Sequence, residues 1–240
     1  MLEVSDLSLG YGKGKGITNI GFQLEPGDRL AVLGANGAGK TTLLKLLGTV
    51  LKPSKGKIFL HGQSFSSNLK ITRQQIGYVP QDIALFSELT VKQELDFWRG
   101  IAPKRIHASK VDEVAGIIGI TDLLHRNINE LSGGMKRKIN LAVALLHGPD
   151  VLVMDEPTAG IDIQSKLEIM KFLKSWSEKG KIIILASHDM EEIHYLTDKV
   201  LILKHGEKQF FGSVEEMNQS FNGASEALSF SEKVAQLGGW

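Results

Sequence analysis

A glycine-rich stretch, Gly34–Thr41, carries the residue types and spacing of a phosphate-binding loop. It matches the pattern G-x-x-x-x-G-K-[ST], in which glycines let backbone N–H groups turn inward around a phosphate. An apolar run precedes it and a helical pattern follows it, which suits the motif because a helix N-terminus adds positive potential. We expect Lys40 to reach the β- and γ-phosphates of a nucleotide, and the Thr41 hydroxyl to ligate Mg²⁺.

Two adjacent carboxylates, Asp155 and Glu156, follow an apolar run at 151–154. A strand in this position delivers both to its C-terminal end, where open α/β sheets bind ligands. One carboxylate can then hold a metal ion through water while the other polarises an attacking water as a general base. We assign Asp155 to the Mg²⁺ shell and Glu156 to the water. A strand that ends in Asp-Glu can also simply cap the following turn.

A second turn, Ser132-Gly133-Gly134, precedes a helical pattern that starts near Met135. Ser132 is a natural N-cap for that helix, and capping alone would explain its presence. The N–H groups of Gly133 and Gly134 would also form an anion site at the helix N-terminus. Because the chain has one glycine-rich phosphate loop, a second phosphate-binding element indicates a second subunit that would complete the site.

The apolar patterning of the chain predicts the elements that position these motifs. Strands are expected at 2–9, 17–24, 29–33, 57–61, 76–79, 151–154, 181–186 and 199–203, with a glycine turn at 10–16. Helices are expected at 40–47, 135–146, 164–178 and 189–196, a helical insert at about 90–126, and an edge strand, a short helix and a tail over 207–240. The alternation of strands and helices after residue 151 predicts a parallel sheet with covering helices.

Composition limits the classes of function that fit the chain. Its 240 residues, 42% apolar and 23% charged, are ordinary for a soluble globular protein that can bury a core. The formal net charge of +1 argues against a strongly basic nucleic-acid surface. Cysteine is absent, which excludes disulfides and thiolate metal sites. We expect no targeting segment at the start, and apolar runs such as 182–186 are far shorter than a membrane span.

Other residues with chemical potential match no pattern. We expect Trp98 and the apolar stripe around it to form the core of the helical insert. We expect the remaining histidines at the surface, namely His61, His107, His125, His147, His194 and His205.

Taken together, the motifs resemble those of the ATP-binding subunits of ATP-binding-cassette (ABC) transporters over nearly the whole chain. Leu131-Ser-Gly-Gly-Met135 is similar to the signature motif of that family and stands between the two nucleotide motifs, as in the family. Gln81, after Gly77-Tyr-Val-Pro80, matches the Q-loop glutamine, which contacts Mg²⁺ and senses the transmembrane partner. Ala159-Gly-Ile-Asp162 occupies the D-loop position.

Two further residues match single positions of the family. His188, in Leu185-Ala-Ser-His-Asp189, matches the switch histidine that contacts the γ-phosphate, and Tyr11 matches the aromatic residue that stacks on adenine. By themselves these signals are weaker. His188 could be a capping or core histidine, Gln81 an ordinary loop residue, and Tyr11 an aromatic residue that closes a glycine turn.

The resemblance implies an α/β fold with a P-loop NTPase core, a mostly parallel sheet, an N-terminal antiparallel β subdomain and a helical insert subdomain. Within a single ABC ATPase domain, it implies that 1–81 and 131–206 form the nucleotide-binding core with the antiparallel part. The helical subdomain would be 82–130, and 207–240 would be a C-terminal edge strand, helix and tail.

The resemblance also implies an ATPase that uses ATP and Mg²⁺. The catalytic residues would be Gln81, Glu156 and His188, and the metal ligands would be Thr41, Gln81 and Asp155. The nucleotide-binding residues would be Tyr11, Gly34, Asn36, Gly37, Ala38, Gly39, Lys40, Thr41, Thr42, Ser132, Gly133, Gly134 and Asp162.

The implied partners are a second cassette, identical or paralogous, and a separate transmembrane permease, with no nucleic acid. Two cassettes would face head to tail around two MgATP, and the chain would be cytoplasmic and peripheral on the membrane through the permease. Two departures from the family pattern favour export. Met135 replaces the commoner Gln of the signature, and the D-loop begins Ala159-Gly-Ile rather than Ser-Ala-Leu. Both resemble the branch of exporters for drugs, polysaccharides and sodium.

Other ABC ATPases fit the sequence less well. A DNA-repair or chromosome-structure ATPase would need a long coiled coil between the nucleotide motifs, where this chain has a short insert. A translation-factor ATPase of this type carries two cassettes. A soluble ATPase that assembles metal clusters stays open as the alternative, and co-purification with a multi-span membrane protein would separate it from a transporter.

Overall fold

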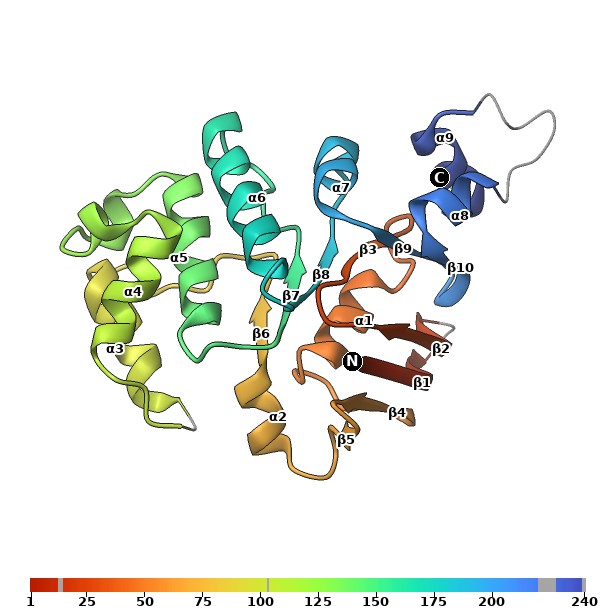
Figure 1. The fold of residues 1–240 in the computed structure, drawn as a ribbon, viewed down its shortest axis with the longest axis horizontal. Coiled ribbons are helices and arrows are strands. Elements are labelled where there is room, and N and C mark those ends of the chain that lie inside the picture. Colours follow the sequence, from red (N-terminus) through yellow and green to blue (C-terminus); the bar gives the residue numbers. More distant parts are fainter. Residues whose placement is uncertain (13–14, 103, 220–227, 239–240) are drawn as a thin grey trace.

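The computed structural model describes residues 1–12, 15–102, 104–219 and 228–238. Its strands form two sheets (Figure 1). The antiparallel sheet has the order β2-β1-β4-β5, with β1 (Leu2–Gly12), β2 (Lys15–Leu24), β4 (Lys55–Leu60) and β5 (Gln63–Ser64). The larger sheet has the order β10-β9-β3-β8-β7-β6, with β3 (Arg29–Leu33), β6 (Ile76–Val79), β7 (Val151–Asp155), β8 (Ile182–Ala186), β9 (Lys199–Lys204) and β10 (Glu207–Ser213).

The larger sheet is parallel except at β10, which pairs antiparallel with β9. Its central strands β7 and β8 are buried along their whole length, as expected for continuous apolar runs covered on both faces. The parallel arrangement brings the C-terminal ends of β3, β6, β7 and β8 to one edge. These observations confirm the predicted α/β fold with a mostly parallel sheet and an N-terminal antiparallel part.

Helix α1 (Lys40–Leu47) lies between the two sheets (Figure 1). Its apolar residues Leu43, Leu44, Leu46 and Leu47 are buried in one core cluster with residues of β1, β2, β3, β7 and β8. This packing fixes the start of α1, and therefore the phosphate loop, against the edge of the parallel sheet.

The opposite face of the parallel sheet is covered by α5 (Gly133–Leu145) and α6 (Ile163–Ser177), which share a second core cluster with β7 and β8. The insert contributes α3 (Val91–Ile101) and α4 (Ser109–Ile118) to the same cluster, followed by the short 3₁₀ helices η1 (Thr121–Leu123) and η2 (Ile128–Glu130). Trp98 packs against this cluster as predicted. The helical insert is thus present, whereas its limits at 82 and 130 stay a prediction.

A third cluster lies where α7 (Met190–Leu196), α8 (Val214–Gln219) and α9 (Phe230–Gly238) meet β9. Helix α9 corrects the prediction, because part of the expected C-terminal tail is helical and buries Val234 in this cluster. The rest of that tail, 220–227 and 239–240, lies outside the described residues.

Other sequence predictions also need correction. Helix α2 (Leu69–Gln75) and the short β5 were not predicted, because neither carries a clear apolar period. The glycine segment 10–16 mostly continues β1 and β2, and only 13–14 lie outside the described residues. His147 is half-buried rather than at the surface: its Nε2 lies 3.0 Å from the Ile76 carbonyl oxygen, and burial lowers its pKa.

Candidate functional site

The loop between β3 and α1 has a backbone that only glycine adopts easily. Gly34 has φ 145° and Gly39 has φ 104°, both in the region that favours glycine. A Cβ at Gly34 would lie 2.3 Å from the Leu203 carbonyl oxygen, and one at Gly39 would lie 2.6 Å from the Ile17 side chain. The glycines therefore let the loop pack closely on its neighbours while it turns into α1.

Lys40, the first residue of α1, is buried at the base of this loop with 8% of its surface exposed. Its Nζ donates hydrogen bonds to the carbonyl oxygens of Gly34 at 2.6 Å and Ala35 at 3.2 Å. Burial lowers the pKa of the ammonium group, and the carboxylates of Glu156 and Asp155 partly offset that effect. The lysine is a buried cation held by the same loop whose N–H groups would surround a phosphate.

Asp155 ends β7 beside the start of α1 and is 3% exposed. The pKa of the Asp155 carboxyl group is raised, chiefly by burial. The hydrogen bond with the Thr41 side chain lowers this pKa, and the neighbouring Glu156 carboxylate raises it. The site therefore offers a hydroxyl and a carboxylate as hard oxygen donors, which suit Mg²⁺. No group of three or more His, Cys, Asp or Glu side chains able to hold a metal occurs in the described part of the chain.

Glu156 follows Asp155 in an unusual backbone conformation, with φ 50°. Its N–H donates to the Ala186 carbonyl oxygen of β8 at 2.9 Å. Its carboxylate meets two other predicted residues: Gln81 Nε2 donates to Oε2 at 3.0 Å, and His188 Nε2 lies 3.3 Å from Oε1. A left-handed conformation at a non-glycine residue costs roughly 1–3 kcal/mol and typically persists at functional sites. The ends of β6, β7 and β8 thus bring the three predicted catalytic side chains together.

These residues line a cavity of about 440 Å³ at the edge of the parallel sheet. Its lining contains most of the predicted site: Tyr11, Asn36, Gly37, Gly39, Lys40, Thr41, Thr42, Gln81, Asp155, Glu156 and His188, together with Lys15 and Gly16. Gly34 and Ala38 belong to the loop beneath it. Among the residues described, the predicted Ser132, Gly133, Gly134 and Asp162 do not line this cavity.

Those four residues come together at a different place. Ser132 caps α5, its hydroxyl accepting a hydrogen bond from the Met135 N–H at 3.3 Å. Asp162 caps α6 by accepting from the Ser165 N–H at 2.9 Å, and hydrogen bonds with Ser165 lower its pKa. A Cβ on Gly134 would lie 2.6 Å from Ser165 Oγ and 3.1 Å from Asp162 Oδ2. The Ser-Gly-Gly turn therefore packs tightly against the segment that follows Glu156.

Sequence reasoning missed a link between this turn and the catalytic edge. The Arg137 guanidinium, one turn into α5, donates a hydrogen bond to the Gln81 carbonyl oxygen. Burial lowers its pKa, and the carboxylates of Asp82 and Glu156 raise it. The basic run at 136–138 was visible in the sequence, but its contact depends on how the insert places α5.

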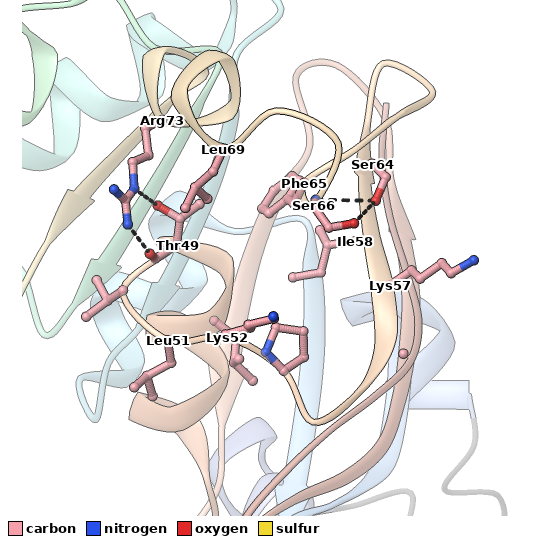
Figure 2. A pocket seen from close by; sticks show the side chains of 14 residues that line it. Thr49, Leu51, Lys52, Lys57, Ile58, Ser64, Phe65, Ser66, Leu69 and Arg73 are labelled. Carbon is pink, nitrogen blue, oxygen red and sulfur yellow. Dashed lines mark hydrogen bonds between the residues drawn. The ribbon is translucent and has the colours of Figure 1, made fainter. Parts of the chain in front are cut away.

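A second cavity, also of about 440 Å³, lies between the end of α1, β4 and α2 (Figure 2). Figure 2 shows Arg73 directed at Thr49, to which its Nε donates at 3.3 Å. None of the predicted site residues lines this cavity. The chemistry is therefore concentrated at the edge of the parallel sheet.

The fold and the phosphate-binding edge define an α/β phosphate-loop ATPase. The family described as "ABC transporter" matches residues 17–159, and the chain belongs to this family. The chain is accordingly an ATP-binding and ATP-hydrolysing cassette. Within the described residues, none of the helices is long and apolar enough to cross a membrane.

Similar proteins support the same placement. The Linearmycin resistance ATP-binding protein LnrL of Bacillus subtilis is 36% identical over 93% of this chain and 72% of its own length. The Molybdate/tungstate import ATP-binding protein WtpC of Pyrococcus horikoshii is 35% identical over 90% of this chain and 63% of its own length. A solved structure, described as the ATP binding subunit of an ABC transporter, covers 99% of both chains at a TM-score of 0.87 and 25% identity.

Proposed function

We propose that this cassette hydrolyses MgATP as a head-to-tail dimer, with an identical or paralogous cassette, and drives export through a separate transmembrane permease. One observation supports the proposal of a dimer. The Ser132-Gly133-Gly134 turn sits at a helix N-terminus suited to phosphate, yet it lies outside the cavity that the phosphate loop forms. A second cassette, turned end to end, can bring its turn to that cavity.

The phosphate loop supplies the nucleotide-binding part of the mechanism. Lys40 would neutralise phosphate oxygens, while Thr41 and Asp155 would supply the oxygen atoms that hold Mg²⁺. Bound Mg²⁺ would neutralise charge that develops on the phosphates. Tyr11, which is 57% exposed at the rim of the same cavity, offers a ring face for the adenine.

The edge of the sheet supplies the hydrolytic part. Glu156 orients and deprotonates the attacking water as a general base. Its contacts with Gln81 and His188 hold the carboxylate near the phosphate loop. We assign His188 to stabilise the charge that would develop on the γ-phosphate, and Gln81 to the residues that would hold Mg²⁺.

A cavity beside the catalytic one also supports an interface. Ile163, the first residue of α6, is 76% exposed. It lines this cavity together with Glu156 and His188. We assign Ile163 to contact with the second cassette. Closure around ATP would cover it, and hydrolysis would remove the phosphate that bridges the subunits.

The relatives' names bear on the direction of transport, and an exposed aromatic pair supports a permease partner. LnrL is named for resistance and another relative for Nod factor export, whereas WtpC is named for import. Beyond Gln81, Phe86 and Phe97 are 47% and 42% exposed and stack edge to face at 5.2 Å between ring centroids. We assign this aromatic pair to contact with the permease, which would hold the cassette at the cytoplasmic face of the membrane.

The variant Glu156→Gln tests the mechanism. Loss of the general base should lower the hydrolysis rate by about 1000-fold while ATP binding persists. The variant should then form a stable dimer with MgATP, measured by size-exclusion chromatography with light scattering. Glu207→Gln on β10 is the matched control and should behave as the unmodified chain. Normal hydrolysis, or a monomer at saturating MgATP, would contradict the proposal.

Pull-down from detergent-solubilised membranes separates transport from the metal-cluster alternative. The unmodified chain should retain a multi-span membrane protein, and Phe86→Ser with Phe97→Ser should release it while ATP binding remains. Retention of soluble cluster-assembly proteins instead would favour the alternative.

A further inference from the structure

Glu192 on α7 is a buried carboxylate close to the catalytic edge, and the mechanism above does not use it. Its exposed fraction is 1%. Burial raises its pKa, whereas interactions with the Ser187 and Thr158 hydroxyls lower it. Carboxylates are rarely buried so fully without a specific set of partners. The residues that contact Glu192 therefore indicate the role of this buried carboxylate.

On one side, Glu192 holds the loop that carries His188. The Ser187 hydroxyl donates to Glu192 Oε2 at 2.5 Å, and the same hydroxyl accepts from the Asp189 N–H at 3.1 Å. The Glu192 N–H donates to Asp189 Oδ1 at 3.1 Å. The residues immediately before and after His188 are thus both bonded, directly or through one atom, to Glu192.

On the other side, Glu192 faces the segment that follows Glu156. Thr158 lies two residues after Glu156 and is 8% exposed. Its hydroxyl interacts with the Glu192 carboxylate and lowers the pKa of that group. Glu192 Oε1 is buried and has no hydrogen-bond partner among the residues described. One oxygen of the carboxylate is committed to the His188 loop, and the other can accept a hydrogen bond from the D-loop side.

A second contact joins the same two segments. The Lys166 ammonium, one turn into α6, pairs with the Asp189 carboxylate, which caps α7. Burial of Glu192 and this ion pair fix the start of α7 against the start of α6. Asp189, which follows His188, is therefore tied to α6, the helix that the D-loop leads into.

We propose that Glu192 is a positioning residue that sets His188 against Glu156 and couples this geometry to the D-loop. The inference rests on the proposed role of His188 in hydrolysis. Without the carboxylate, Ser187 loses its acceptor, and the 3.3 Å contact between His188 and Glu156 is no longer fixed. Lys40 and Thr41 are not bonded to this network, so binding of ATP should be preserved.

The test compares Glu192→Leu with Glu192→Gln in the full chain. Leu removes the acceptor, and we expect kcat to fall about 30-fold with the KM for ATP within about twofold. Gln keeps an acceptor for the Ser187 hydroxyl, and we expect kcat within about threefold of the unmodified chain. Glu191→Leu on the exposed side of the same helix is the matched control and should keep normal kcat.

A double-mutant cycle distinguishes positioning from a general structural role. In a His188→Ala background, measured in single-turnover assays, Glu192→Leu should lower the rate by less than about twofold, because its target is gone. An equal loss in both backgrounds would overturn the inference. If Glu192→Leu does not fold, Ser187→Ala replaces it in the cycle. Its effect on the rate is then measured in the unmodified chain and in the His188→Ala variant, with the same expected results.

The outcomes also separate this inference from the proposed function. If His188→Ala is slow while Glu192→Leu and Ser187→Ala keep normal kcat, the inference falls and the proposed function stands. If His188→Ala keeps normal kcat, the assigned role of His188 falls, and the inference falls with it.

Discussion

Two turns of this chain each open a helix with glycine, yet they lie in very different surroundings. The first leads into α1 at Gly39, and the second leads into α5 at Ser132. Neither helix has an acidic residue in its first turn, so both N-termini favour an anion. The first turn is surrounded by a buried lysine, two carboxylates, a glutamine and a histidine, all lining one cavity.

The second turn lies outside that cavity, and it packs instead against the D-loop through Gly134. We propose from this difference that the first turn is a nearly complete nucleotide site and that the second is half of one. The D-loop follows Glu156 in sequence and packs against Gly134 of the second turn. A structural change at one turn can therefore reach the other through the D-loop.

Gly134→Ala should disrupt the packing of the second turn, and we expect it to lower ATP hydrolysis more than the other two substitutions below. The added Cβ would lie 2.6 Å from Ser165 Oγ and 3.1 Å from Asp162 Oδ2, so Ser165, whose N–H donates to Asp162 of the D-loop, must shift. We expect kcat to fall about 30-fold, while the Kd for ATP of the isolated chain changes by less than about twofold. Gly116→Ala on α4 is the matched control, because no atom lies within 4 Å of its added Cβ. Equal ATPase rates for the two variants would show that the D-loop contact is irrelevant to hydrolysis.

Tyr11→Ala sharpens the account of the first turn. Loss of a stacking ring should weaken ATP binding about tenfold, with little change in kcat at saturating ATP. Tyr11→Phe keeps the ring and should bind ATP normally. Titration with a fluorescent ATP analogue measures both. If the Phe variant binds as weakly as the Ala variant, the stacking role is wrong.

Glu94→Gln concerns the helical insert, which packs against the helix that follows the second turn, and its effect should be the smallest. Glu94 is buried, accepts from Trp98 Nε1 at 2.8 Å and from the Phe86 N–H at 3.2 Å, and burial raises its pKa above 4.5. A carboxyl group with a raised pKa in the folded state stabilises the fold at low pH. That contribution is lost as pH rises from about 4.5 through the folded-state pKa.

The Gln variant lacks this titration. Its melting temperature relative to the unmodified chain should therefore increase as the pH rises from about 4 to 7. The measurement is thermal unfolding followed by circular dichroism at each pH. A constant difference across that range would contradict the raised pKa.

Much of the first turn could be predicted from sequence because its chemistry is local. The loop needs glycine where the backbone has positive φ, and the buried strands β3, β7 and β8 are unbroken apolar runs. The carboxylates follow β7 directly, so their position at the edge of the sheet follows from strand direction alone.

Other features depend on contacts between distant residues and left no local signal. The contact of Arg137 with the Gln81 backbone joins α5 to the end of β6. The left-handed backbone of Glu156 and the burial of Glu192 arise from packing on β8 and on the D-loop. Helix α2 is short and weakly periodic, so its sequence could not distinguish it from a loop.

Mixing two inactive variants tests the central claim, that the two turns complete each other across a dimer. Lys40→Ala removes the first turn's cation, and Ser132→Arg blocks the second turn. In a head-to-tail heterodimer, one of the two sites combines an intact phosphate loop with an intact Ser-Gly-Gly turn. With random pairing, an equal mixture should therefore recover about a quarter of the unmodified ATPase rate. A mixture as inactive as either variant alone would contradict the account.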